Sequence, residues 1–138
     1  MAKKNPVDIA EIQAILKRLH GGKPHELIVI FVPSADRHNK EITDQAQWAS
    51  AALDLFGKLF TGATAFKFLD GIYQPQGAAP LYDKPIMIQS LTDTSNLEDL
   101  DKLLELSEFC HHMGEQTDQA SIGVILNNFF IDIKISGD

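Results

Sequence analysis

The chain has 138 residues, of which 44% are hydrophobic and 22% charged, and its formal net charge is −7. This length suits one domain that can bury a hydrophobic core without the help of disulfide bonds or bound metals. The acidic net charge argues against nucleic acid as a partner, because phosphate binding normally needs a basic face. No apolar run is long enough to cross a bilayer and the N-terminus lacks a signal peptide's apolar core, so we expect no membrane partner and a cytoplasmic location.

The first predicted element is an N-terminal helix. Asn5 can cap it, Pro6 suits the first helical position, and Gly21-Gly22 ends it. Its apolar residues repeat at helical spacing and must pack on the domain body or on another subunit: Ile9, Ile12, Leu16 and Leu19. We therefore divide this single-domain chain into a helix with its linker, residues 1–24, and a domain over residues 25–138.

Two further helices lie between the predicted strands. Thr43 or Asp44 caps the first of them. Its predicted buried residues are Trp48, Ala52, Leu55, Phe56 and Leu59. A capping box from Ser95 to Glu98 starts the second, and Gly114 is its expected left-handed terminator. The single Cys110 excludes an internal disulfide, and its place on the apolar stripe of this helix favours a buried structural thiol over a nucleophile.

The predicted strands and helices follow one another in an order that is typical of a known fold. The predicted strands are residues 27–32, 63–69, 85–91 and 122–133, and residues 70–83 form a turn and a longer loop. With the two helices they give strand, helix, strand, strand, helix, strand. This is the split βαβ, ferredoxin-like pattern of the α+β class, which has a four-stranded antiparallel sheet with two helices on one face. The alternative is a three-layer arrangement in which the N-terminal helix covers the other face.

Polar segments gather at one edge of this predicted fold. Right-handed crossovers make the first and second strands parallel, and likewise the third and fourth. Residues 34–40, 70–83 and 111–119 then converge at the same edge, whereas residues 61–64 and 91–94 at the opposite edge read as ordinary turns. This asymmetry is the main argument for a functional site.

Five residues of these segments are candidate ligand-binding residues. Asp36 and Arg37 directly follow the buried first strand, which is a usual place for binding groups. Thr117 and Gln119 face one way at the start of the last strand, and Tyr73 can close a cleft beside them. The structural alternative is that Asp36 caps a solvated turn and that Thr117 and Gln119 satisfy strand-end backbone groups.

Glu115, His112 and His38 are candidate catalytic residues. Glu115 with either histidine could form an acid–base pair if partly buried. Because a helix C-terminus disfavours a carboxylate, Arg37 could hold Glu115 across the edge. The alternative is a salt-bridged surface cluster. Adjacent histidines on a helix point about 100° apart and rarely share an ion. No HExxH or phosphate-binding motif occurs either, so we expect no metal and no cofactor.

The chain resembles a group of small bacterial proteins of unassigned function, over residues 26–133. The group's pattern runs DR, then W, then LFGGATA, then G followed by an aromatic residue, and MGxETNQ before an apolar strand. The matching positions are Asp36-Arg37, Trp48, 59–65, Gly71, Tyr73 and 113–119. Thr61 replaces a glycine and Asp118 replaces an asparagine. The resemblance draws interest to Asp36, Arg37, Glu115, Thr117 and Gln119 without assigning roles.

Two functions from different classes remain open. We favour a binding or interaction module whose polar edge recognises a small polar ligand or a protein partner. We also expect a homo-oligomer, formed through the sheet face or the first helix, because such a sheet leaves one face needing cover. The alternative is a small enzyme that uses Glu115 and a histidine for general acid–base chemistry on a polar metabolite. The architecture cannot decide between them, because it hosts many unrelated functions.

Overall fold

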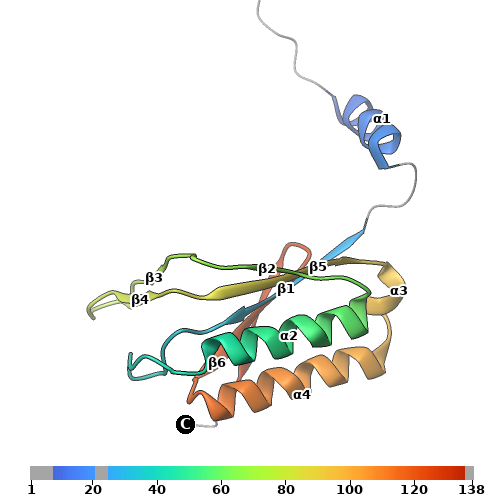
Figure 1. The fold of residues 1–138 in the computed structure, drawn as a ribbon. Coiled ribbons are helices and arrows are strands. Elements are labelled where there is room, and N and C mark those ends of the chain that lie inside the picture. Colours follow the sequence, from blue (N-terminus) through green and yellow to red (C-terminus); the bar gives the residue numbers. More distant parts are fainter. Residues whose placement is uncertain (1–7, 21–24, 136–138) are drawn as a thin grey trace, which may run out of the picture.

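A computed structural model describes residues 8–20 and 25–135, which form a mixed α+β structure (Figure 1). Its helices are α1 (Ile9–His20), α2 (Gln45–Phe60), α3 (Thr94–Leu97) and α4 (Leu100–Gln116). Its strands are β1 (Glu26–Val32), β2 (Thr64–Phe66), β3 (Gly71–Tyr73), β4 (Leu81–Asp83), β5 (Ile86–Thr92), β6 (Ser121–Leu126) and β7 (Phe129–Lys134). None of the helices in this described part is long and apolar enough to cross a membrane.

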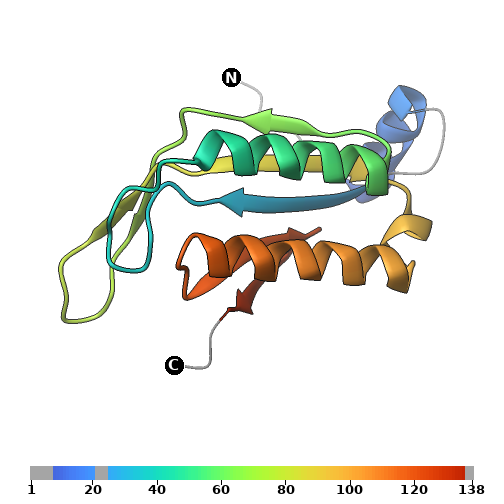
Figure 2. The same cartoon turned by 60° about the horizontal axis from the view of Figure 1, so that its bottom comes forward.

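The main sheet has five antiparallel strands in the order β2-β5-β1-β6-β7. Helices α2 and α4 lie side by side on one face (Figures 1 and 2). The first four strands follow the order expected of the βαββαβ pattern, but the prediction of a four-stranded sheet is wrong. The predicted strand 122–133 folds instead as the hairpin of β6 and β7. Asn127, at φ 55°, makes the tight turn, because asparagine tolerates the left-handed conformation.

A second, two-stranded sheet forms where the sequence predicts only a turn and a loop. Gly71 pairs with Asp83 and Tyr73 with Leu81, so β3 and β4 make a hairpin. In the chain, this hairpin connects β2 to β5. The hairpin projects from the end of the main sheet at which β1 ends (Figure 1). It therefore stands beside the loop that follows β1.

The hydrophobic core lies between the main sheet and the helices α2 and α4. Ile28, Ile30 and Val32 on β1 are fully buried there, since alternate residues of a strand share one face. Phe56 and Phe60 meet edge to face at 5.2 Å between ring centroids. The predicted buried positions on α2 hold for Ala52, Phe56 and Leu59, whereas Trp48 and Leu55 are partly buried at the edge of the core. Cys110 is buried and free, as expected.

Both predicted ends of the last long helix are wrong. Residues 94–97 form the short helix α3, and Asp99 caps α4 by accepting hydrogen bonds from the N–H groups of Asp101 (3.1 Å) and Lys102 (3.3 Å). Gly114 lies inside α4, and the left-handed residue is Asp118 (φ 51°). A Cβ atom on Gly114 would lie 2.5 Å from the side chain of Ile135. Glycine is needed there for close packing.

The predicted N-terminal helix is present as α1, and its apolar stripe does not pack on the domain body. Asp8 accepts a hydrogen bond from the N–H of Glu11 (2.8 Å) at the helix start, whereas the expected Asn5 cap, Pro6 and Gly21-Gly22 lie outside the described residues. The apolar stripe is exposed, with Ile9 74% and Leu19 75% accessible. α1 therefore does not cover the second face of the sheet, and the three-layer alternative is wrong.

Candidate functional site

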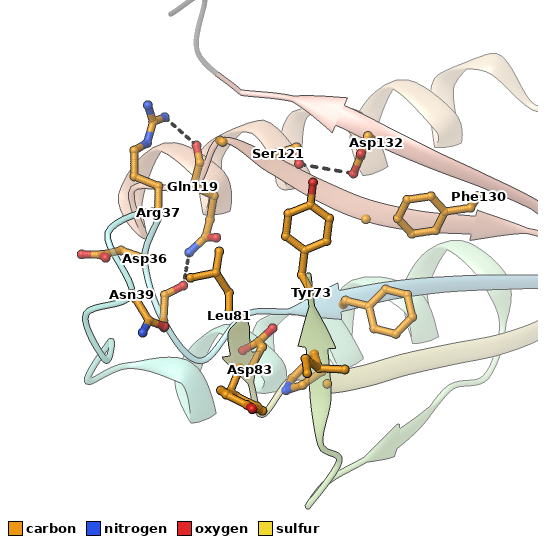
Figure 3. Close-up of a pocket in the computed structure, with 18 residues that line it drawn as sticks. Asp36, Arg37, Asn39, Tyr73, Leu81, Asp83, Gln119, Ser121, Phe130 and Asp132 are labelled. Carbon is orange, nitrogen blue, oxygen red and sulfur yellow. Dashed lines mark hydrogen bonds between the residues drawn. The ribbon is translucent and has the colours of Figure 1, made fainter. Parts of the chain in front are cut away.

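A cleft of about 710 Å³ opens at the end of the sheet where the hairpin stands (Figure 3). Its lining comes from the end of β1 and the loop after it, from the β3–β4 hairpin, and from β6 and β7 with the residues that lead into β6. All three polar segments that the topology places at one edge therefore contribute to it. The cleft reaches from that edge onto the sheet face opposite α2 and α4, because Phe31 and Gly123 alternate with core residues.

Aromatic side chains form much of the cleft wall. Phe31 comes from β1, Tyr73 from β3 and Phe130 from β7. In Figure 3 the side chain of Tyr73 points across the cleft towards Ser121. Tyr73 and Phe130 are 66% and 61% exposed, so their surfaces are open to a ligand. Aromatic walls with a few polar groups are typical of small-molecule sites.

Ser121 and Asp132 provide a polar pair on this wall. The Ser121 hydroxyl donates a hydrogen bond of 3.2 Å to the Asp132 carboxylate across the β6–β7 hairpin. Asp132 is exposed, and an ionised carboxylate offers about four acceptor positions. The pair can therefore still accept hydrogen bonds from a ligand.

Asp83 fixes the hairpin to the loop after β1. Its carboxylate accepts hydrogen bonds from the backbone N–H (3.0 Å) and the hydroxyl of Ser34, and the Lys84 N–H donates to that hydroxyl oxygen at 2.9 Å. These bonds position one wall of the cleft, so the role of Asp83 is structural.

Asp36 organises the loop itself. Its carboxylate accepts hydrogen bonds from the backbone N–H groups of Lys40 (2.9 Å) and His38 (2.8 Å). The N–H of Lys40 is the main cause that lowers the pKa of Asp36 below its ordinary value of 3.8. Asp36 is thus ionised at neutral pH and caps the turn, which is the structural role weighed above.

Arg37 and Gln119 join this loop to the start of β6. The Arg37 guanidinium donates to the backbone oxygen of Gln119 (2.9 Å) and lies 3.3 Å from the Asp118 carboxylate. The Gln119 amide donates to the backbone oxygen of Ala35 (2.7 Å). The expected Arg37–Glu115 contact does not occur among the described residues: Arg37 contacts the Asp118 carboxylate, and Glu115 is exposed to solvent.

The cleft includes four of the five predicted ligand-binding residues: Asp36, Arg37, Tyr73 and Gln119. Thr117 lies apart from them. It is only 4% exposed, and its hydroxyl donates to the backbone oxygen of Met113 (2.7 Å) at the end of α4. Its position satisfies a helix-terminal carbonyl, and its role in binding stays a prediction.

The predicted catalytic residues do not line the cleft. His112 packs edge to face on Trp48, with ring centroids 5.5 Å apart, and His38 lies 3.8 Å from the Asp118 carboxylate. Glu115 stands on the exposed end of α4. An acid–base pair between Glu115 and a histidine stays a prediction, without support from this geometry. Within the described ranges, no group of three or more acidic, histidine or cysteine residues could hold a metal ion.

Sequence reasoning missed Phe31, Ser121, Phe130 and Asp132 as lining residues. The unbroken apolar run that contains Phe31 predicted a strand buried on both faces, and therefore a core position for Phe31. The other three depend on the β6–β7 hairpin, which brings Asp132 beside Ser121. The signal was present in Asn127-Asn128, a two-residue turn between two apolar stretches.

The comparisons with known proteins bear on the fold alone. No protein family matches the sequence, and no curated protein is significantly similar to it. A phage SAM lyase in complex with S-methyl-5′-thioadenosine is similar in structure, with a TM-score of 0.56 and 14% identity, over 82% of this chain and 92% of that one. A phage SAM lyase in the apo state is also similar in structure, with a TM-score of 0.57 and 14% identity, over 82% of this chain and 91% of that one. The divalent ion tolerance protein CutA1 from Ehrlichia chaffeensis is more distant, with a TM-score of 0.40 and 10% identity, over 85% and 89%.

Proposed function

We propose that this protein is a binding module whose cleft takes a small polar ligand of the nucleoside class. The observation that carries the proposal is the composition of the cleft wall. Tyr73 and Phe130 offer aromatic rings on residues that are largely exposed, and Ser121 with Asp132 offers hydrogen-bonding groups on the same wall. A flat base stacks on aromatic rings, and the hydroxyl groups of a ribose donate to a carboxylate.

The volume of the cleft agrees with such a ligand. Small-molecule sites usually measure about 300–1,000 Å³, and this cleft has about 710 Å³. Its other charged groups are engaged within the protein: Asp83 with Ser34, Asp36 with its own loop, and Arg37 with Asp118. The Ser121–Asp132 pair is therefore the main polar recognition element of the proposal.

The likeness to the phage SAM lyase guides the choice of first ligand. That protein has been solved with S-methyl-5′-thioadenosine, which combines an adenine ring with a ribose. The same chemistry would suit the wall described above. S-Methyl-5′-thioadenosine and SAM are therefore the first compounds to test, with free adenine to separate the contribution of the ring from that of the ribose.

Isothermal titration calorimetry tests the proposal directly. We expect S-methyl-5′-thioadenosine or SAM to bind with one site per chain, more tightly than adenine. Because a base stacked on an aromatic ring contributes about 1–3 kcal/mol, Tyr73→Ala should raise the Kd about tenfold or more. Phe68→Ala is the matched control, since Phe68 is 97% exposed and does not line the cleft. No binding of either nucleoside, or an equal effect of both substitutions, would overturn the proposal.

The enzymatic alternative is tested in the same samples. The one observation in its favour is that a structurally similar protein is a lyase, and that likeness extends to the fold alone. Chromatography of SAM incubated with the protein would reveal turnover, and Glu115→Gln would then abolish it if Glu115 acts as the acid or base. Binding without turnover would leave the module as proposed.

A further inference from the structure

The outer edge of β7 is an exposed strand edge that carries both apolar and charged residues. β7 is the last strand of the main sheet, so within residues 8–20 and 25–135 no other strand pairs with one side of its backbone. Phe129, Phe130 and Ile131 are 68%, 61% and 41% exposed. Proteins normally shorten, charge or cover such edges, because the unpaired N–H and C=O groups recruit another strand.

The pairing with β6 determines which backbone groups face outwards. The N–H of Ile135 donates to the backbone oxygen of Ala120 (3.1 Å), and the register pairs Ile133 with Ile122 and Ile131 with Val124. Hydrogen bonding alternates along an antiparallel strand. The N–H and C=O groups of the remaining residues therefore point to the open edge: Phe130, Asp132 and Lys134.

We propose that β7 pairs with β7 of a second copy of this chain, antiparallel and about a two-fold axis at Ile133. In this register Asp132 lies opposite the partner subunit's Lys134, and Lys134 lies opposite the partner subunit's Asp132. Each subunit therefore contributes one charged residue to each of two cross-strand ion pairs. Such a self-complementary surface is the usual basis of a two-fold dimer.

Charge complementarity selects this register from its neighbours. Only residues with outward backbone groups can form the new hydrogen-bonded pairs, so the register changes in steps of two residues. A shift by one step places Asp132 opposite the partner subunit's Asp132, and like charges in that position are destabilising. A further step pairs Asp132 with the partner subunit's Phe130 and forms no ion pair. The register at Ile133 is therefore the one in which both charged residues find partners.

The dimer would also change the cleft. Asp132 and Phe130 line it from β7, so the strand added beyond β7 would border the cleft at that rim. The partner subunit's Lys134 would stand opposite Asp132 on the same face of the extended sheet, because both residues share the parity of the strand. The second copy thus supplies a cation at the border of the site. The proposed interface uses the sheet edge, whereas the sheet face and α1 are the surfaces expected from the sequence to associate.

Sedimentation equilibrium of the full chain without ligand tests the interface, with charge reversals as probes. Asp132→Lys places two lysines opposite each other, and Lys134→Asp places two aspartates opposite each other. We expect each single substitution to raise the dimer Kd about tenfold or more, because both symmetric pairs are lost. The double exchange, Asp132→Lys with Lys134→Asp, keeps the composition of the chain and restores opposite charges. Its Kd should return close to that of the unchanged protein.

Each outcome of the sedimentation experiment either supports or contradicts the proposed pairing of β7 with β7 of a second copy. A concentration-dependent dimer with the loss and recovery described above would establish the pairing. A protein that stays monomeric at millimolar concentration would overturn it. A dimer whose Kd is unaffected by the single substitutions, or is not recovered by the exchange, would place the interface elsewhere. Circular dichroism of each variant verifies that the fold persists, and Lys58→Asp on α2 reports the effect of a charge reversal away from β7.

Discussion

Two glycines in the long helices occupy opposite environments. Gly114 on α4 is buried, and an added Cβ atom would lie 2.5 Å from two side-chain atoms of Ile135. Gly57 on α2 has nothing within 4 Å of the same position. Glycine weakens a helix relative to alanine unless packing requires it. The contact at Gly114 therefore explains a glycine inside a helix.

Alanine substitutions at these two positions should have opposite effects on stability. Gly114→Ala must displace Ile135 and should lower the free energy of unfolding by about 1–3 kcal/mol, as overpacked sites do. Gly57→Ala should leave it unchanged or raise it by about 0.5–1 kcal/mol. Urea denaturation of both variants measures the difference. Equal free energies of unfolding for the two variants would mean that the side chain of Ile135 moves aside without a loss of stability.

The site was only partly predictable at this scale. Asp36, Arg37 and Gln119 were found because they follow or precede buried strands, and the chain path brings such positions together. The sequence could not reveal that their side chains mostly bond the protein itself. That outcome depends on loop geometry, such as the hydrogen bond between Arg37 and the backbone of Gln119, 82 residues away.

The start of α4 shows how two helix-capping signals compete along one stretch of chain. Ser95 and Glu98 have the spacing of a capping box, yet the long helix begins after Asp99, whose carboxylate accepts from two backbone N–H groups. α3 ends before this point, and Asn96 on it donates to the hydroxyl of Thr92 (2.8 Å). A second cap one turn later thus replaces the predicted one.

Alanine substitutions separate the two caps. Asp99→Ala should lower the free energy of unfolding by about 0.5–2 kcal/mol, because two N–H groups at the start of α4 lose their acceptor. Ser95→Ala should change it by less than about 0.5 kcal/mol. Thermal denaturation with a fixed heat-capacity change gives both values. A larger effect at Ser95 would favour the capping box.

The presence of helices and strands with long regular patterns was predicted, although not always their ends, whereas elements defined by tertiary pairing were not predicted. α2 and β1 follow from helical spacing and from an unbroken apolar run. The β3–β4 hairpin has only three residues in each strand and no alternation to mark it. Its strands pair with each other, and the hydrogen bonds from Ser34 to Asp83 hold them beside the loop after β1. Interactions of that kind are not encoded in a local pattern.

At the scale of the whole molecule, the buried thiol reports on global unfolding. Burial raises the pKa of Cys110 from its ordinary value of 9.0 to about 12. Below pH 9 the thiol is protonated in both the folded and the unfolded chain. Between pH 9 and 12 the unfolded chain releases this proton while the folded chain retains it. This shift therefore stabilises the fold below pH 9, and that contribution is lost as the pH rises towards 12.

We expect the free energy of unfolding to fall between pH 9 and 12, partly through Cys110. The Cys110→Ala variant is the reference that isolates the contribution of the thiol. Its stability will be lower overall but should fall less steeply with pH than that of the unchanged protein. Parallel pH dependences from chemical denaturation would exclude a contribution from the thiol.

The central position of β1 has a consequence for synthesis on the ribosome. β1 begins at residue 26, yet its two neighbours in the sheet are β5 and β6, and Ile28 pairs with Leu126. Residue 126 must therefore leave the exit tunnel before both sides of β1 are covered. Until then the apolar residues of β1 stay available to chaperones, and the main sheet cannot consolidate around its central strand.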